Sequence, residues 1–249
     1  MHWMLMAVLA LLTAGGAWAE VPATSEPVSF PAAGEDAPLL VGELSLPARP
    51  NAGARVAGVV VCHPDPAMGG TMDNIVVIAI RDHLLRRGIA VLRFNFRGTG
   101  GSAGEHSGGV REPQDVLGAL EFLRAQPAVR PRRVALAGYS FGSRMAAEAM
   151  AREPRVLAGA FVGFPTGLET IVPEEWGFLG KIERPMWLVT GESDQYSSIL
   201  NLVTLQVYYG LDAQVVELEG ADHFFVDADT RAAMADEVGS FLSQKLLAR

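Results

Sequence analysis

The pattern Gly-x-Ser-x-Gly, which can present a serine hydroxyl as a nucleophile, occurs twice in this chain of 249 residues. One copy spans residues 100–104 around Ser102, and the other spans residues 138–142 around Ser140. The pattern exposes its serine on a tight turn between a strand and a helix, where the neighbouring chain leaves no room for other side chains at the two glycines. The context of each copy therefore decides which serine can react.

Only the Ser140 copy has a strand before it and a helix after it. Residues 133–137 form a short apolar run of the kind found in buried parallel strands. Residues 141–152 are rich in Ala, Met and Glu and contain no proline, which predicts a helix. Residues 97–109, around Ser102, contain too many glycines to begin a helix and are predicted to form a loop. We therefore interpret Ser140 as the nucleophile.

A serine nucleophile needs a base, and the base needs a group that orients it. On an elbow of this kind the acid and then the histidine follow the serine along the chain. Of the five histidines, His2, His63, His83 and His106 precede Ser140, and only His223 follows it. His223 is therefore the expected base, whereas His83, on a predicted helix among charged residues, is expected to be solvated.

Asp194 is the expected acid, because it follows the apolar run 186–190 with Gly-x-x-Asp spacing. Glu192 remains the alternative acid. Asp222, directly before His223, is expected to stabilise a turn instead.

The negative charge that develops on the attacked carbonyl oxygen needs two backbone N–H donors. The residue after the nucleophile, Phe141, supplies one. The second must come from the loop after residues 56–62, where Pro64 and Pro66 have no N–H and Asp65 does. The Asp65 carboxylate is expected to point away from the oxyanion. Loop residues predicted to face the substrate are Met68, Tyr139, Trp176, Phe178, Tyr196 and Phe224.

Strands and helices alternate along the chain. Apolar runs predict strands at residues 39–46, 56–62, 89–96, 133–137, 156–164, 186–190 and 214–218, and helical patterns cover residues 72–87, 112–126, 141–152, 200–209 and 229–247. This alternation predicts an α/β fold with a mostly parallel central sheet and helices on both faces. The segment between residues 164 and 186 is too short for a substantial cap domain, so we expect an open pocket.

The N-terminal residues differ from the rest. Residues 3–19 carry no charge and end in Ala17-Trp18-Ala19, which is typical of a cleaved signal peptide. We expect a signal peptide at residues 1–19, a linker at residues 20–38 and one domain at residues 39–249, in a protein exported to the periplasm or secreted. Because no Lys or Arg precedes the apolar run, an uncleaved anchor or a start at Met4 or Met6 remains open.

Composition excludes several classes of function. The formal net charge of −8, without any basic run, argues against a nucleic-acid partner. Cys62 is the single cysteine, so no intramolecular disulfide can form, and it is expected to pack as an apolar residue.

Residues 98–103 imitate a Gly-x-Gly-x-x-Ala dinucleotide site, but no helix is predicted to begin there, and a dinucleotide site of this kind needs one. No metal or other cofactor is predicted.

Four motifs occur in order: Cys62-His63-Pro64-Asp65-Pro66, Gly69-Gly70-Thr71-Met72-Asp73-Asn74, Asn95-Phe96-Arg97-Gly98 and Gly138-Tyr139-Ser140-Phe141-Gly142. Together they resemble the compact lidless bacterial α/β-hydrolases with HPHP-like, GGTMDN, NFRG and GxSxG motifs. The resemblance covers residues 39–249 and implies the α/β-hydrolase fold and a Ser-Asp-His triad. It also implies that the loop after Asn95 flanks the active site, where we expect Arg97 to anchor it to Asp115. Asp65 departs from the family, which usually has a second histidine there.

These features predict a serine hydrolase that cleaves carboxylic esters of small molecules through an acyl-enzyme. A non-catalytic protein of the same fold in the cell envelope, an acyltransferase or peptidase with the same triad, and a dinucleotide-dependent oxidoreductase are the alternatives. The substrate and the oligomeric state are left open by the sequence.

Overall fold

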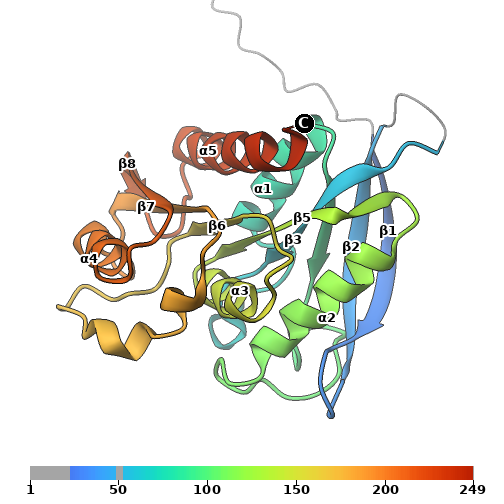
Figure 1. The fold of residues 1–249 in the computed structure, drawn as a ribbon, viewed down its shortest axis with the longest axis horizontal. Helices are drawn as coiled ribbons and strands as arrows, with labels where there is room; N and C mark the ends of the chain where they lie inside the picture. The colour runs from blue at the N-terminus through green and yellow to red at the C-terminus, as the bar shows by residue number, and fades with distance from the viewer. Residues whose placement is uncertain (1–22, 49–52, 249) are drawn as a thin grey trace, which may run out of the picture.

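The computed structural model describes residues 23–48 and 53–248. In this part of the chain the strands form one sheet in the order β1-β2-β4-β3-β5-β6-β7-β8 (Figure 1). The strands are β1 (Ala23–Pro31), β2 (Leu39–Pro47), β3 (Val56–Cys62), β4 (Ala90–Phe94), β5 (Val129–Tyr139), β6 (Gly159–Val162), β7 (Met186–Ser193) and β8 (Ala213–Asp222). β2 pairs antiparallel with β1 and β4, and every other pair is parallel. The predicted mostly parallel sheet is confirmed.

Helices cover both faces of this sheet, as predicted. They are α1 (Ile75–Arg86), α2 (Glu112–Ala125), α3 (Phe141–Arg152), α4 (Ile199–Tyr209) and α5 (Ala228–Leu247). α1 and α5 lie together on one face, and α2, α3 and α4 cover the other (Figure 1). Because both faces are covered, central strands such as β3 are apolar on both sides and nearly all their residues are buried.

The predicted linker at residues 20–38 is wrong over most of its described length. Residues 23–31 form β1, which pairs with β2 from Ala23 opposite Pro47 to Pro31 opposite Leu39. Phe30 is buried against Phe94 and Phe122 and anchors this strand to the core. Prolines suggested an irregular segment, but an edge strand tolerates proline because one side of its backbone makes no ladder hydrogen bonds.

The segment between β6 and β7 contains only two short 3-10 helices, η2 (Pro173–Trp176) and η3 (Leu179–Lys181). It forms no separate cap domain, which agrees with the prediction. It runs along the side of the molecule that carries α3 and α4 (Figure 1).

The charged neighbours of His83 in the sequence predict a solvated surface residue, but the structure buries this side chain. It is only 7% exposed, and its Nδ1 lies 3.2 Å from Arg87 Nη1 and 3.9 Å from Asp236 of α5. Burial, aided by Arg86 and Arg87, lowers the pKa of His83 to about 4. The contact between α1 and α5, which the sequence does not reveal, buries this side chain.

The predicted signal peptide at residues 1–19 lies outside the described residues. Within residues 23–48 and 53–248, no helix is both long enough and apolar enough to cross a membrane.

Candidate active site

Ser140 occupies the sharp turn between β5 and α3. Its φ of 53° and ψ of −125° belong to a region that residues other than glycine rarely adopt. A Cβ atom on Gly138 would collide with the carbonyl oxygen of Gly142, and one on Gly142 would collide with those of Cys62 and His63. Both glycines of the pattern are therefore required by neighbouring backbone, as the sequence predicted: Gly138 by the start of α3 and Gly142 by the end of β3 and the residue after it.

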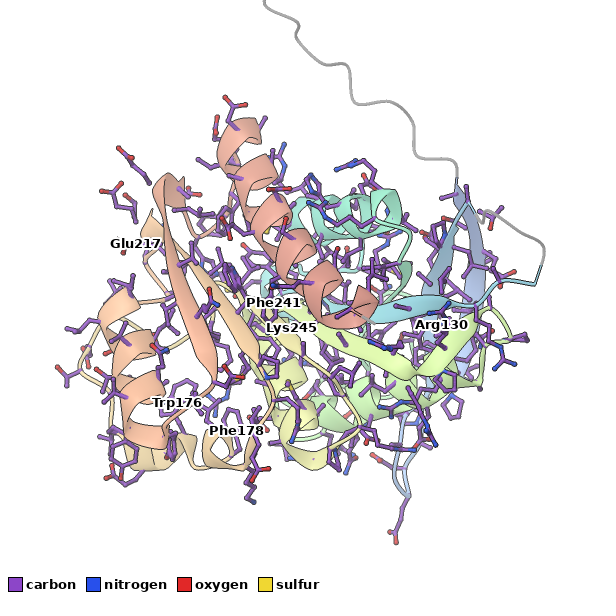
Figure 2. All side chains as sticks on the ribbon, turned by 45° about the horizontal axis from the view of Figure 1, so that its top comes forward. Arg130, Trp176, Phe178, Glu217, Phe241 and Lys245 are labelled. Atoms are coloured by element: carbon purple, nitrogen blue, oxygen red, sulfur yellow. The ribbon has the colours of Figure 1, made fainter. Side chains whose placement is uncertain are left out.

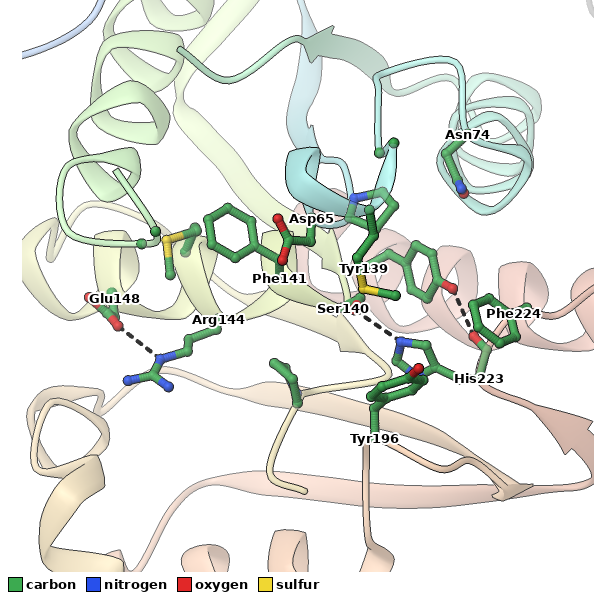
Figure 3. Close-up of a pocket in the computed structure, with 18 of the residues that line it drawn as sticks. Asp65, Asn74, Tyr139, Ser140, Phe141, Arg144, Glu148, Tyr196, His223 and Phe224 are labelled. Atoms are coloured by element: carbon green, nitrogen blue, oxygen red, sulfur yellow. Dashed lines mark hydrogen bonds and ion pairs between the residues drawn. The ribbon is translucent and has the colours of Figure 1, made fainter. Parts of the chain in front are cut away.

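A continuous hydrogen-bonded chain joins Ser140, His223 and Asp194. His223 Nε2 lies 3.0 Å from Ser140 Oγ (Figure 3). On the other side of the ring, His223 Nδ1 lies 2.8 Å from both carboxylate oxygens of Asp194. An ionised carboxylate only accepts hydrogen bonds, so the imidazole proton resides on Nδ1 and Nε2 is left as the acceptor for the serine hydroxyl. The structure thus brings the three predicted residues together in the orientation that activates a serine.

The acid beside His223 is Asp194 rather than Glu192. The Asp194 side chain is buried, and its Oδ1 accepts the backbone N–H groups of Tyr196 at 2.8 Å and Ser197 at 2.9 Å. Glu192 is exposed and accepts the N–H of Gly220 at 3.0 Å. The two backbone donors fix the Asp194 carboxylate against the imidazole.

The loop that carries His223 is fixed at both sides of that residue. Asp222 Oδ1 accepts the N–H groups of Phe224 at 3.0 Å and Phe225 at 2.9 Å, which is the turn role expected of Asp222. The Tyr139 hydroxyl donates to the backbone carbonyl of His223 at 2.8 Å (Figure 3). Burial raises the pKa of Tyr139, so this hydroxyl stays a donor. Tyr139 therefore holds the base as well as lining the cavity.

Phe141 and Asp65, the two expected oxyanion donors, line the same cavity as Ser140. Neither backbone N–H group donates a hydrogen bond to another of the described residues. The Asp65 carboxylate is engaged by its own loop, since its Oδ1 accepts the N–H of Ala67 at 2.8 Å and lies 3.6 Å from His106 Nε2. Both amides are therefore available to a negatively charged oxygen beside Ser140.

The second Gly-x-Ser-x-Gly copy holds two segments together. The hydroxyl of Ser102 donates to the carbonyl of Asn95 at 2.7 Å and accepts the N–H of Val41 at 2.9 Å, and Ser102 is buried. The same loop is anchored by the expected Arg97–Asp115 pair, in which Arg97 Nη2 lies 2.6 Å from Asp115 Oδ1 and both side chains are buried. Ser102 is thus committed to backbone groups.

His63 also has a structural position. Its Nε2 accepts the N–H of Phe96 at 3.0 Å, and its Nδ1 lies 2.6 Å from the carbonyl oxygen of Pro64. Burial lowers the pKa of His63 to about 4, so the ring is neutral at pH 7. The adjacent Cys62 is buried, as predicted, and burial raises the pKa of its thiol. Neither residue is placed to act as base or nucleophile.

A cavity of about 560 Å³ opens above Ser140. Of the six predicted substrate-binding residues, Met68, Tyr139, Tyr196 and Phe224 line it. Trp176 and Phe178 do not: they lie beside each other on the segment before β7, with ring centroids 6.3 Å apart (Figure 2). Trp176 packs on the core residue Phe164, so this part of the prediction is wrong.

Gly163 and Arg144 are among the residues of the site that the sequence analysis did not identify. Gly163, directly after β6, has a φ of +54° and faces the His223 ring. Arg144, one helical turn after Ser140 on α3, lines the cavity with Glu148. The available signal for Arg144 was its place in the first turn of the helix predicted to begin directly after Ser140. Gly163 had no signal in the sequence, since its constraint comes from a distant loop.

Several known proteins are similar to this chain. An uncharacterized protein of Rickettsia prowazekii is 32% identical over 173 residues, which cover 67% of this chain and 71% of that protein. Among solved structures, an α/β serine hydrolase without a lid from Xanthomonas campestris is 26% identical, with a TM-score of 0.71 over 90% of this chain and 96% of that one. An α/β serine hydrolase homologue from Coxiella burnetii is also 26% identical, with a TM-score of 0.64 over 86% of this chain and 99% of that one.

A family model described as an alpha/beta hydrolase domain matches residues 56–244, which include Ser140, Asp194 and His223. The mostly parallel sheet with helices on both faces is consistent with this match. The chain belongs to the α/β-hydrolase family.

Proposed function

We propose that this protein is a serine hydrolase that cleaves carboxylic esters through an acyl-enzyme formed on Ser140. The observation that carries the proposal is the unbroken chain from Asp194 through His223 to the hydroxyl of Ser140, a residue held at a strained φ of 53°. Strained backbone at a reactive side chain is typical of functional sites.

In the first half-reaction, Ser140 Oγ attacks the ester carbonyl carbon while its proton passes to His223 Nε2. The carboxylate of Asp194 stabilises the resulting imidazolium. The carbonyl oxygen becomes negative and accepts hydrogen bonds from the amides of Phe141 and Asp65. When the tetrahedral intermediate collapses, the C–O bond to the alcohol breaks and His223 gives its proton to the departing oxygen.

The second half-reaction repeats these steps with water. His223 removes a proton from water as the water oxygen attacks the acyl carbon, and it then returns a proton to Ser140 Oγ as the acid leaves. The open cavity supports an ester function because small acyl groups and water can both reach Ser140.

Labelling with a fluorophosphonate tests the nucleophile. The wild type and Ser102→Ala should become covalently labelled, and Ser140→Ala should not. Hydrolysis of p-nitrophenyl acetate should follow the same pattern, with Ser140→Ala losing about 10³-fold or more of its kcat. Ser102→Ala is the matched control because it removes the hydroxyl of the other Gly-x-Ser-x-Gly copy.

Labelling of Ser140→Ala would overturn the assignment of the nucleophile. A wild-type protein that reacts with neither reagent, while folded by circular dichroism, would instead favour a non-catalytic binding protein. A comparison of ester with anilide substrates separates esterase from peptidase activity.

A further inference from the structure

We propose that the ester carries a carboxylate group and that Arg144 binds this carboxylate inside the cavity. The inference rests on the proposed ester hydrolysis at Ser140 and adds the class of substrate. Among the described residues that line the cavity, Arg144 is the one arginine or lysine. It lies in the first turn of α3, four residues after Ser140, the N-cap residue of this helix.

The guanidinium group of Arg144 is held in place by two contacts. Its Nε lies 3.2 Å from Glu148 Oε1, and its Cζ lies 4.7 Å from the centroid of the Trp176 ring (Figure 3 shows the pair with Glu148). Trp176 is itself buried against Phe164, so it offers a fixed surface for stacking. Trp176 therefore positions the Arg144 side chain, although it does not itself line the cavity.

These contacts leave the outer edge of the guanidinium group available. Nη1 and Nη2 of Arg144 have no acceptor among the described residues, and the side chain is 41% exposed. Two parallel N–H groups at this edge match the two oxygens of a carboxylate in spacing and direction. The guanidinium group is held through its Nε and one face, so its two remaining nitrogen atoms are arranged to donate hydrogen bonds to both oxygens of one carboxylate.

The charge around Arg144 favours an anion. Glu148, the partner of Arg144, also lies 3.7 Å from Arg152 Nη2. One carboxylate thus serves two guanidinium groups, and the three side chains together carry a formal charge of +1. The other carboxylate on the cavity lining, that of Asp65, is engaged by the N–H of Ala67 and lies 3.6 Å from His106. The cluster of Arg144, Glu148 and Arg152 therefore carries a net positive charge at the Arg144 end of the cavity.

The cavity that both Ser140 and Arg144 line limits the size of the substrate. The carbon chain between the ester carbonyl and the bound carboxylate must fit inside its volume of about 560 Å³, which favours short substrates. Half-esters of short dicarboxylic acids meet this requirement, as do esters of short hydroxy acids with the carboxylate on the alcohol side. Both present the same anion to Arg144.

Two pairs of isosteric esters test the proposal by pH-stat. Monomethyl glutarate, with the carboxylate on the acyl side, is compared with methyl 5-methylhexanoate, in which an isopropyl group replaces the carboxylate. 3-Acetoxypropionate is compared with 3-methylbutyl acetate in the same way for the alcohol side. The wild type should prefer the anionic member of at least one pair by about tenfold in kcat/KM, the low end for a charged hydrogen bond at a partly exposed site.

Arg144→Met should abolish this preference, mainly by raising KM for the anionic ester, because the lost contact is equally strong in the ground and transition states. Arg144→Lys should retain part of it. Arg152→Met is the matched control, since Arg152 contacts Glu148 but does not line the cavity. It removes one charge of the cluster but not the group that contacts the anion, so it should keep most of the preference that Arg144→Met loses. A preference that survives Arg144→Met, or a wild type that prefers the neutral esters, would overturn the proposal.

Binding of glutarate, measured by isothermal titration calorimetry, separates this proposal from the proposed reaction. Ser140→Ala should bind glutarate at least tenfold more tightly than Ser140→Ala/Arg144→Met does. Equal affinities of the two variants would refute carboxylate recognition. If affinities differ as expected but no ester is hydrolysed, the binding proposal stands and the proposed reaction fails.

Discussion

Gly163 lies against the ring of His223: a Cβ atom on Gly163 would stand 2.9 Å from the imidazole Cε1 and 3.4 Å from Asp194 Oδ2. The glycine follows β6, the strand next to β5, which ends directly before Ser140, and its φ is +54°. The His223 ring and the Asp194 carboxylate thus pack against the backbone of Gly163. Their alignment with Ser140 depends on the absence of a side chain at this position.

Replacing Gly163 by alanine should therefore damage activity more than stability. The added methyl group must displace the His223 ring, and a displacement of well under 1 Å from the productive geometry lowers kcat by about tenfold to a hundredfold. Hydrolysis of p-nitrophenyl acetate measures this loss. Urea denaturation should show a loss of about 1–2 kcal/mol from the unfavourable φ.

Gly210→Ala is the matched control, because Gly210 has a similar φ of +60° and no atom within 4 Å of its Cβ position. It should lose a similar amount of stability and keep its kcat within about threefold. Equal loss of kcat in Gly163→Ala and Gly210→Ala would show that backbone strain, and not contact with His223, is responsible.

Asp194→Asn should lower kcat by about 10³- to 10⁴-fold with little change in stability. The asparagine oxygen can still accept the N–H groups of Tyr196 and Ser197, but its amide can donate to His223 Nδ1 and so favours the wrong tautomer. Glu192→Gln removes the other candidate acid and should keep kcat within about threefold. A large loss in Glu192→Gln with little loss in Asp194→Asn would contradict the positions of the two carboxylates.

The reactive residues could be predicted because their constraints are local or follow chain order. Ser140 was identified by the strand before it and the helix after it, and His223 by being the one histidine that follows. Features fixed by contacts between distant segments were not accessible. Nothing near Gly163 in the sequence indicates that His223 packs on it, and nothing near His83 reveals that α5 covers it.

The errors in the prediction have the same origin. The prolines of residues 23–31 indicate a linker only until β2 is known to pair with them. Trp176 and Phe178 follow the strand β6, which suggested that they face the substrate. Instead, Trp176 is part of the hydrophobic core and Phe178 packs against that core, so neither ring lines the cavity. In each case tertiary packing decides between two structures that the local sequence allows.

Arg97→Met should destabilise the protein by about 3–5 kcal/mol, because it leaves the buried carboxylate of Asp115 without its cation. Arg111→Met is the matched control: Arg111 pairs with Asp36 at 2.7 Å, but both side chains are more than 40% exposed, and an exposed pair contributes about 0–1 kcal/mol. Urea denaturation monitored by circular dichroism measures both. The double variant Arg97→Met/Asp115→Leu should recover part of the loss; a double variant as unstable as the single one would point to lost packing and not to the unpaired charge.

His63 should make the folded state less stable as the pH falls from 7 to 4.5. Burial lowers the pKa of His63 to about 4 in the folded protein, below its ordinary value of 6.5. The unfolded chain therefore binds more protons between these two pH values, and acid favours unfolding. For one histidine the loss over this range is about 2 kcal/mol.

His63→Gln tests this pH dependence, because the glutamine oxygen can accept the N–H of Phe96 in place of Nε2 but cannot take up a proton in this range. The free energy of unfolding, measured in urea at pH 7, 5.5 and 4.5, should fall by about 2 kcal/mol less in His63→Gln than in the wild type. His83, whose pKa burial also lowers to about 4, is present in both proteins, so the difference between them isolates His63. If the free energy of unfolding fell equally with pH in the two proteins, the pKa of His63 would not be lowered as its burial between the loops after β3 and β4 requires.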